Sequence, residues 1–295
     1  MNTLSGQEAL LYDHVLDKTV QCHVCHHECL IKVDSRGICG VRENRQGTLY
    51  ALNYGITVAA AIDPIEKKPL YHFLPGSSIY SFATVGCNLR CAWCQNWDIS
   101  QSPKPNRPIE GTPVTPEEHV RRAQKHGCPS IAYTYSEPTV FLEYALATMK
   151  LAREKGLKNV WVTNGFMSPA TLDLILPYLD AANVDLKGFD DDVYLRYCGA
   201  AAGPVMTNLK RMQAAGVHLE VTTLIVPGVN DSPEQLKTIA EALVFNLGLD
   251  VPWHVTRFFP AWKMTSVPVT PLAILTEAKT IGHQAGLHFV HIGNV

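Results

Sequence analysis

The chain has 295 residues, of which 46% are hydrophobic and 18% are charged, and its formal net charge is −2. These values are typical of a folded globular protein and exclude a disordered or fibrous chain. A charge so close to zero gives no electrostatic footprint for nucleic acid or for an anionic membrane surface, so neither is expected as a partner.

The N-terminal segment MNTLSGQEALLYDHVL mixes acidic with apolar residues and lacks the layout of a signal peptide. No apolar run in the chain approaches the length of a bilayer span. We therefore expect a cytoplasmic protein, whose thiols stay reduced. In that setting nine cysteines indicate metal binding or catalysis rather than a disulfide framework.

The first cysteine group lies in a stretch from about residue 20 to 78 that is rich in Cys, Gly and short β-prone pieces. Its segment CHVCHHECLIKVDSRGICG matches neither the bacterial ferredoxin run nor a standard zinc ribbon. We predict a Cys-rich metal-binding module over residues 1–78. Zinc is favoured over a second iron-sulfur cluster, because a closed four-thiolate site would stabilise a module too small to bury a core. The expected ligands are Cys22, Cys25, Cys29 and Cys39, with the interleaved histidines mostly solvated.

From residue 79 onward, short apolar runs alternate with longer helix-compatible stretches, which is the pattern of repeated βα units. Near-continuous apolar strands imply a parallel sheet covered by helices, and right-handed crossovers would close it into a full or partial (β/α) barrel over residues 79–295. The fold class is therefore α/β. Strands are expected at 79–86, 130–135, 159–164, 182–187, 217–226, 253–259 and 287–293, and helices at 117–127, 139–156, 168–179 and 232–248.

Polar residues gather at or just after the ends of several of these strands, where parallel barrels build their active sites. They are Cys87, Glu137, Asn164, Asp185 and Lys187.

The segment GCNLRCAWCQN places Cys87, Cys91 and Cys94 on one loop after the first barrel strand. Iron-sulfur clusters are held by cysteine thiolates, usually four of them, so three ligands would leave one iron of a [4Fe-4S] cluster open. A zinc site completed by a histidine, or a set of packed thiols, stays open as an alternative.

At these residues the sequence resembles the radical S-adenosylmethionine (SAM) superfamily, whose hallmark is C-x3-C-x-aromatic-C, with Trp93 as the aromatic residue here. The resemblance extends from about residue 79 to 293. It includes the activating enzymes of pyruvate formate-lyase and other glycyl-radical enzymes. It is closest to the radical SAM proteins of the AmmeMemoRadiSam system, on the strength of PIEKKPLYHFLPGS and the N-terminal cysteines. Relatives of this group continue beyond the final HIGNV into a further cysteine-bearing tail.

The resemblance implies that SAM binds at the cluster and is cleaved to a 5′-deoxyadenosyl radical that abstracts hydrogen from an unidentified substrate. It also implies an electron donor such as flavodoxin or ferredoxin, and partner proteins of the AmmeMemoRadiSam system. Cleavage would take place in a closed mouth with four aromatic residues nearby: Trp93, Tyr133, Tyr135 and Phe259. Aromatic residues at strand ends more often serve packing alone, and that alternative stays open.

Four residues resemble the SAM contacts of the family. Glu137 would hold the SAM ammonium, and Asn164 would lie near the sugar and methionine portions. Lys187 would pair with the SAM carboxylate, while Asp185 would hold Lys187 or a ribose hydroxyl. Each has an alternative that needs no ligand, namely a helix N-cap for Glu137, a strand-ending turn for Asn164 and a buried ion pair for Asp185 and Lys187.

Three further features carry open interpretations. VPGVND, at 226–231, resembles the stretch along the adenine, although its composition would form a turn on its own. The sixth strand ends in RFFPAW and lacks the histidine of the activating enzymes, so the nearest candidates are His254 and Arg257. Cys198 is a candidate catalytic residue that would donate a hydrogen atom or form a thiyl radical. As a small buried hydrophobe it would have no such role, and Cys128 is expected to be one.

Three functions are compatible with the sequence. The first is a radical SAM enzyme that acts on a small molecule or modified nucleoside. The second is an activating enzyme that installs a glycyl radical on a partner protein. The third is an iron-sulfur or zinc protein without catalysis.

Overall fold

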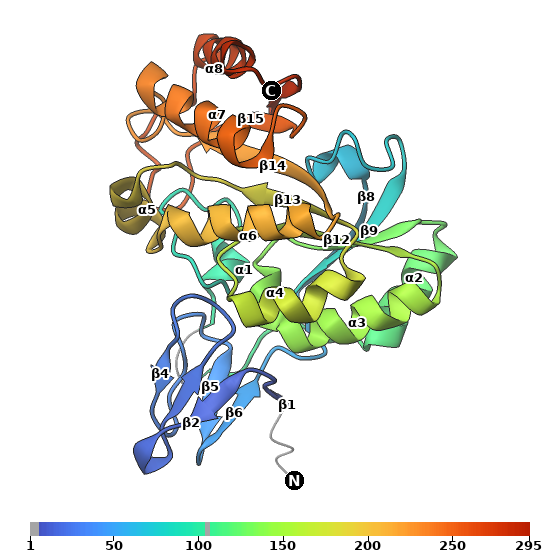
Figure 1. The fold of residues 1–295 in the computed structure, drawn as a ribbon. Coiled ribbons are helices and arrows are strands. Elements are labelled where there is room, and N and C mark those ends of the chain that lie inside the picture. The colour runs from blue at the N-terminus through green and yellow to red at the C-terminus, as the bar shows by residue number, and fades with distance from the viewer. Residues whose placement is uncertain (1–5, 104–106) are drawn as a thin grey trace.

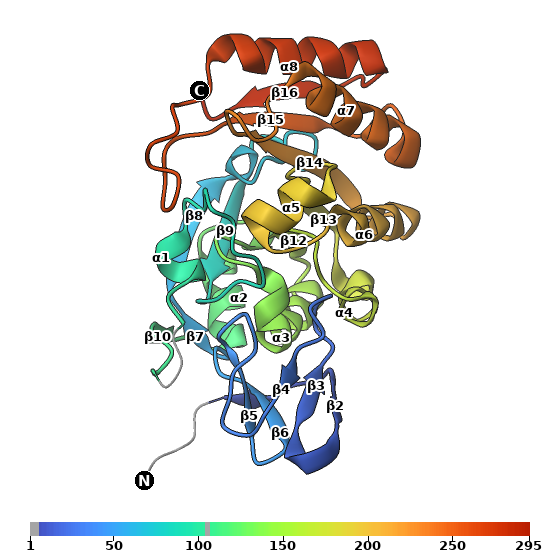
Figure 2. The same ribbon diagram turned by 90° about the vertical axis from the view of Figure 1, so that its left-hand side faces the viewer.

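The structure is a computed structural model that describes residues 6–103 and 107–295. Its N-terminal part consists of two small antiparallel sheets (Figures 1 and 2), which lie at the opposite end of the molecule from helix α8 (Leu272–Ala285). One sheet has the order β1 (Gln7–Glu8), β6 (Thr48–Ala51), β5 (Arg42–Arg45), and the other has the order β2 (Tyr12–His14), β3 (Val20–Cys22), β4 (Leu30–Ile31), with the 3-10 helix η1 (Leu16–Lys18) between β2 and β3.

The larger part is built on one eight-stranded sheet, in which seven strands run parallel and β8 (Ala59–Pro64) pairs antiparallel at one edge. Because β8 and the last strand form the two edges, the sheet is a partial barrel. This confirms the predicted α/β fold class, and every strand expected from the sequence is present. The parallel strands are β9 (Ser78–Ala83), β11 (Ser130–Tyr133), β12 (Lys158–Thr163), β13 (Ala181–Asp185), β14 (His218–Ile225), β15 (Trp253–Arg257) and β16 (Val290–Gly293).

Helices connect the parallel strands and pack on the outside of the sheet (Figure 1). Thr115, Ser168 and Ser232 each cap a helix by accepting a hydrogen bond from a backbone N–H of the first turn, and a proline follows each of them. The α-helices are α1 (Trp97–Ser100), α2 (Pro116–Lys125), α3 (Leu142–Glu154), α4 (Pro169–Ile175), α5 (Asp191–Cys198), α6 (Ala202–Ala214), α7 (Pro233–Leu247) and α8. Short elements complete the chain: β7 (Ile56–Thr57) paired with β10 (Thr112–Pro113), and the 3-10 helices η2 (Ile65–Lys67), η3 (Pro138–Phe141) and η4 (Leu176–Tyr178).

The predicted boundary between residues 78 and 79 falls inside the large sheet. β8 lies before it and pairs with β9 over six residues, from Ala59 with Ala83 to Pro64 with Ser78. The sheet therefore begins upstream of the predicted barrel, and the division of the chain into domains stays a prediction.

The two small sheets are joined to the large one by a buried ion pair. Arg42 of β5 donates to both carboxylate oxygens of Glu143 of α3, at 3.0 and 2.7 Å, and both side chains are almost completely buried. Gly86, three residues after the end of β9, packs so closely on the N-terminal part that a Cβ there would lie 2.8 Å from Val41. The cysteine-rich part and the barrel thus share one interior.

Among the described residues, none of the helices is both long and apolar enough to cross a membrane.

Candidate active site

A cavity of about 490 Å³ lies at the carboxyl ends of the parallel strands. The structure brings every polar strand-end residue expected from the sequence to this cavity, because the carboxyl ends of parallel strands meet at one edge of a sheet. It is lined by the cysteines Cys87, Cys91 and Cys94, by the other predicted residues Trp93, Glu137, Asn164, Asp185 and Lys187, and by further residues that include Lys67, Lys68, Tyr135, Thr222, Thr256 and Asn294.

Helix α5 supports the three-cysteine loop from behind. The backbone N–H groups of Arg90 and Ala92 donate to the last two residues of the helix, Cys198 and Tyr197, both at 2.9 Å. A hydrogen bond from the Cys198 thiol lowers the pKa of the Cys91 thiol, and Lys187 lowers it further, against the effect of burial. Cys198 is fully buried and is not among the residues that line the cavity. In this position it supports the loop, whereas the catalytic role stays a prediction.

The other two cysteines of the loop have polar neighbours of their own. The Sγ atom of Cys87 accepts a hydrogen bond from the N–H of Leu89 at 3.3 Å, and the Sγ atom of Cys94 lies 3.3 Å from the hydroxyl of Ser100. Within the described residues, no three His, Cys, Asp or Glu side chains gather closely enough to hold one metal ion. Three cysteine thiols on one loop are a donor set that suits an iron-sulfur cluster with one iron left open.

Glu137 is the N-cap of η3, as the alternative interpretation allowed. Its Oε1 atom accepts hydrogen bonds from the backbone and hydroxyl of Thr139, at 3.0 and 2.6 Å, and from the hydroxyl of Thr163 at 2.7 Å. Its Oε2 atom accepts from the N–H of Asn164 at 2.8 Å. Burial raises the pKa of Glu137. The side chain is fixed rigidly, and the described contacts give Oε2 only one partner.

Asn164 connects β12 to the cysteine loop. Its amide donates to Oδ1 of Asn88 at 2.8 Å and lies 3.8 Å from Sγ of Cys87, while its own Oδ1 accepts from the N–H of Phe166 at 2.9 Å. The strand-ending turn that the sequence allowed is therefore present, and the same side chain also contacts the loop.

Asp185, the last residue of β13, and Lys187, two residues further on, form an ion pair in which Nζ of Lys187 donates to Asp185 at 2.8 Å. Burial opposes the charge on Lys187, but Asp185 and the neighbouring thiols raise its pKa well above the ordinary value. Asp185 is about a third exposed on the cavity side. The pair is thus a charged element of the cavity wall.

Several residues considered for the mouth lie elsewhere, and Tyr133 has the packing role that was the alternative for it. Tyr133 lies on the opposite face of β11 from the cavity, where its hydroxyl donates to Asn159 at 2.9 Å, because alternate residues of a strand face opposite sides. His254 lies near the start of β15, at the far end of the barrel, and contacts Glu220 at 2.6 Å. Arg257 turns away to donate to Thr270, and Phe259 is not a cavity residue.

The VPGVND segment forms a self-contained turn. Asn230 accepts from the N–H of Val226 at 2.7 Å and donates to the carbonyls of Lys187 and Leu224. None of its residues lines the cavity. Contact with an adenine therefore stays a prediction without geometric support.

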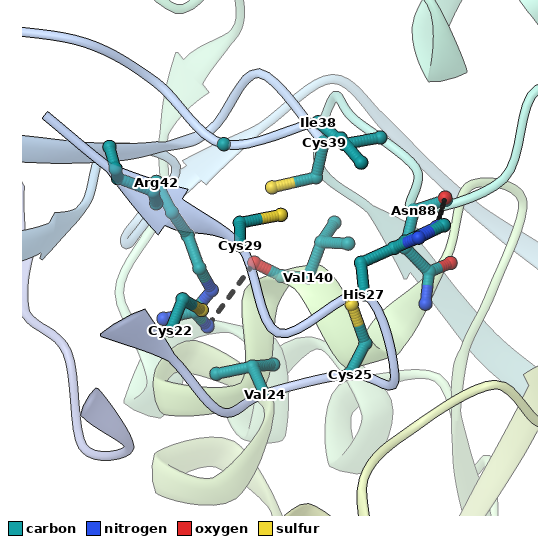
Figure 3. Close-up of a pocket in the computed structure, with 12 residues that line it drawn as sticks. Cys22, Val24, Cys25, His27, Cys29, Ile38, Cys39, Arg42, Asn88 and Val140 are labelled. Atoms are coloured by element: carbon teal, nitrogen blue, oxygen red, sulfur yellow. Dashed lines mark hydrogen bonds between the residues drawn. The ribbon is translucent and has the colours of Figure 1, made fainter. Parts of the chain in front are cut away.

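The four N-terminal cysteines line one common cavity, together with Arg42, Val140 and Asn88 (Figure 3). His27 lines it as well, and its Nε2 atom lies 2.7 Å from the carbonyl of Asn88, so the expectation of solvated histidines is wrong for this one. Asn88 directly follows Cys87 of the other cysteine group. The segment around Cys25 also pairs with the residues after β12, through a bridge to Met167. The two cysteine groups are thus neighbours in space.

Sequence reasoning assigned no role to Lys68, Asp63 or Asn88. Lys68 lies in PIEKKPLYHFLPGS, a segment whose resemblance to known proteins was noted without a function. The available signal for a functional lysine was the pair Lys67 and Lys68 directly before Pro69. Nothing in the order of the sequence elements indicates that this segment enters the barrel.

The family model of the radical SAM superfamily matches residues 82–243, more than half of the chain, and the chain belongs to this superfamily. It is accordingly an enzyme of a family that implies a [4Fe-4S] cluster and SAM.

Particular relatives extend this result. An uncharacterized protein of Methanocaldococcus jannaschii is 45% identical over 98% of this chain and 85% of its own length. The pyruvate formate-lyase-activating enzyme of Clostridium pasteurianum is 25% identical over 54% of this chain and 66% of that protein. Among solved structures, a radical SAM methyltransferase from Sphaerobacter thermophilus shares the fold, with a TM-score of 0.58 and 17% identity over 75% of this chain and 67% of that one.

Proposed function

We propose that Cys87, Cys91 and Cys94 hold a [4Fe-4S] cluster whose open iron faces the cavity of about 490 Å³ and binds SAM. The observation that carries this proposal is that three thiols of one loop line the same cavity as the polar ends of the neighbouring strands. When bound, a reduced cluster of this kind supplies one electron to the sulfonium of SAM, which yields methionine and a 5′-deoxyadenosyl radical able to abstract hydrogen from a substrate.

The cavity residues have distinct parts in this function. Lys187 offers an ammonium to the carboxylate of SAM, and its pairing with Asp185 keeps it charged and oriented. Oε2 of Glu137 offers an acceptor to the SAM ammonium, while the three donors on Oε1 keep the carboxyl in place. Asn164 fixes the residue that follows Cys87. Trp93 is 3% exposed and closes the wall against water.

The substrate we propose is a small molecule or modified nucleoside that binds in the same cavity, which Lys68 also lines. An electron donor such as flavodoxin or ferredoxin would reduce the cluster, and proteins of the AmmeMemoRadiSam system are the proposed partners. The second candidate function is installation of a glycyl radical on a protein. It is favoured by the similarity to the pyruvate formate-lyase-activating enzyme of Clostridium pasteurianum.

Reductive cleavage tests the proposal. Anaerobic protein with a reconstituted cluster, SAM and dithionite should yield 5′-deoxyadenosine, and Cys94→Ala should not. A fully loaded wild-type protein that yields none would refute the proposal. A glycyl-radical signal in the electron paramagnetic resonance (EPR) spectrum of a candidate partner protein would favour the second function over the first.

We also propose that the N-terminal cysteines hold a second metal centre, since all four line one cavity. The small size of the module favours zinc. A second iron-sulfur cluster is the alternative, since such clusters are also held by cysteine thiolates, usually four of them. Metal analysis of anaerobically purified protein decides between them, because zinc would accompany the irons of one cluster in the first case and be absent in the second. Cys39→Ala should remove only the second centre.

A further inference from the structure

The segment from η2 to about residue 74 fills the interior of the partial barrel. Ile65 and Leu70 are fully buried in one apolar cluster with residues of four central strands. The backbone is fixed as well, because Asn183 donates to the carbonyl of Pro69 at 2.7 Å. Glu220 accepts from the N–H groups of Tyr71 and His72, at 3.0 and 2.8 Å. Lys68 is therefore held at a defined position inside the barrel.

Lys68 is a buried cation with unused donor capacity. Its side chain is 2% exposed, and Nζ donates to Asp63 at 2.6 Å and to the hydroxyl of Tyr135 at 3.4 Å. An ammonium has three N–H donors, and the described contacts account for two of them. Lys68 lines the same cavity as the three cysteines of the loop. The remaining donor is thus available to a molecule in that cavity.

The charges at this end of the cavity do not cancel. The carboxylate of Asp63 accepts from Lys68, from Lys67 at 2.9 Å and from the hydroxyl of Tyr135 at 2.5 Å. One carboxylate therefore serves two ammonium groups, which leaves a net positive charge. The acidic residues that line the cavity, Glu137 and Asp185, lie at the strand ends beside the cysteine loop and belong to the proposed SAM site.

Tyr135 connects this cation to the cysteine loop. Its backbone adopts φ 62°, a left-handed conformation that is uncommon for a residue other than glycine and that is found preferentially at functional sites. Its carbonyl accepts from the amide of Asn96, two residues after Cys94, at 2.8 Å. Its ring lies under the ammonium of Lys68, with Nζ 4.4 Å from the ring centroid. Tyr135 is two residues from Glu137, so Lys68 and the proposed SAM site lie in adjoining parts of the same cavity.

We propose that Lys68 binds an anionic group of the substrate, a carboxylate or a phosphate, and that Asp63 and Tyr135 position its ammonium. The inference rests on the proposed function, since it names the class of molecule on which the radical would act. Charge-assisted hydrogen bonds of lysine to carboxylate or phosphate are short and strong, and burial strengthens them further.

The test is equilibrium binding without turnover. Anaerobic holoprotein is first titrated with SAM in a calorimeter, in the absence of reductant, so that the SAM site is filled. It is then titrated with inorganic phosphate and, separately, with succinate, which distinguishes the two anion classes. We expect at least one of these anions to bind. Lys68→Gln should weaken binding roughly tenfold or more, as expected for the loss of a charge-assisted hydrogen bond, while SAM still binds.

Matched variants keep the result interpretable. Lys67 binds the same carboxylate, but its own side chain is 66% exposed. Lys67→Gln should therefore weaken anion binding much less than Lys68→Gln. Lys68→Arg should retain part of the affinity. Asp63→Asn removes the carboxylate that positions the ammonium and should also weaken anion binding, while SAM still binds.

Binding of neither anion to wild-type protein would overturn the proposal, and so would equal affinities in wild-type protein and Lys68→Gln. Failure of SAM to bind would count against the proposed function instead. In that case the anion titrations of SAM-free protein still report on Lys68 separately.

Discussion

The buried ion pair between Arg42 and Glu143 provides a quantitative test of how the N-terminal part is attached to the barrel. The substitution Glu143→Gln keeps the shape of the side chain but leaves the guanidinium of Arg42 buried without a counter-charge. Both side chains are at most 3% exposed, and two hydrogen bonds join them. Removing one partner of such a pair costs about 3 to 5 kcal/mol. We expect the free energy of unfolding to fall by this amount at neutral pH.

Urea titration followed by tryptophan fluorescence measures the loss, at matched metal content. Glu241→Gln is the control, because its pair with Lys237 is 3.7 Å long and both side chains are more than half exposed. Such a surface pair contributes about 0 to 1 kcal/mol. A loss in Glu143→Gln no larger than in this control would refute the account of the junction.

The pH dependence adds a second check on the same variant. Burial raises the pKa of Glu143, but Arg42 lowers it more, so the net shift is downward. A carboxyl with a lowered folded-state pKa stabilises the protein fully above its unfolded-state pKa, about 4.3, and loses that contribution as the pH falls through the folded-state value. The difference between wild-type protein and Glu143→Gln should therefore shrink below about pH 4.3. A difference that stays constant through that range would contradict the assignment.

Three further predictions concern other parts of the chain. In Gly86→Ala the new methyl group would lie 2.8 Å from Val41, and the backbone φ of 103° is unfavourable for alanine. Urea titration should show that the free energy of unfolding falls by about 1 to 3 kcal/mol. The control Gly127→Ala has open space around the new methyl group and should lose less stability. Burial lowers the pKa of His119 to about 3. As the pH falls below about 6.5, the unfolded chain takes up a proton at this residue while the folded protein does not, so the protein loses about 1.4 kcal/mol of stability per pH unit. This loss should be absent in His119→Gln. Cys198→Ala should keep its iron and form 5′-deoxyadenosine, because the thiol is buried behind the loop. Loss of 5′-deoxyadenosine at full iron content would instead indicate that Cys198 takes part in SAM cleavage.

Much of the fold follows from local patterns that the sequence states directly. The buried parallel strands are mostly apolar, as in SIAY of β11, and several helices begin with a capping Ser or Thr before a proline. Strand β8 was missed because its sequence, AAAIDP, has no alternation and is mostly exposed. Its pairing with β9 depends on tertiary contacts that no local pattern encodes.

The candidate site was predictable wherever a residue follows a strand, since the strand end alone fixes its place. This holds for Glu137, Asn164 and Lys187. Prediction failed where the face of the strand mattered, as for Tyr133, the last residue of β11, whose hydroxyl bonds Asn159 outside the cavity. Tyr135 lines the cavity because it lies beyond the end of the strand, where its left-handed backbone breaks the alternation. It failed for Lys68 too, because that residue enters the cavity from a connecting segment. Such long-range placement depends on packing of the whole barrel.

The central claim is that the three-cysteine loop holds a cluster with an open iron that binds SAM in the cavity. EPR spectroscopy of the dithionite-reduced cluster, recorded with and without SAM, tests it most directly. The account predicts a spectrum that changes when SAM is added to wild-type protein and a signal from the loop cluster that is lost in Cys94→Ala. A fully loaded wild-type cluster whose spectrum is the same with and without SAM would contradict it.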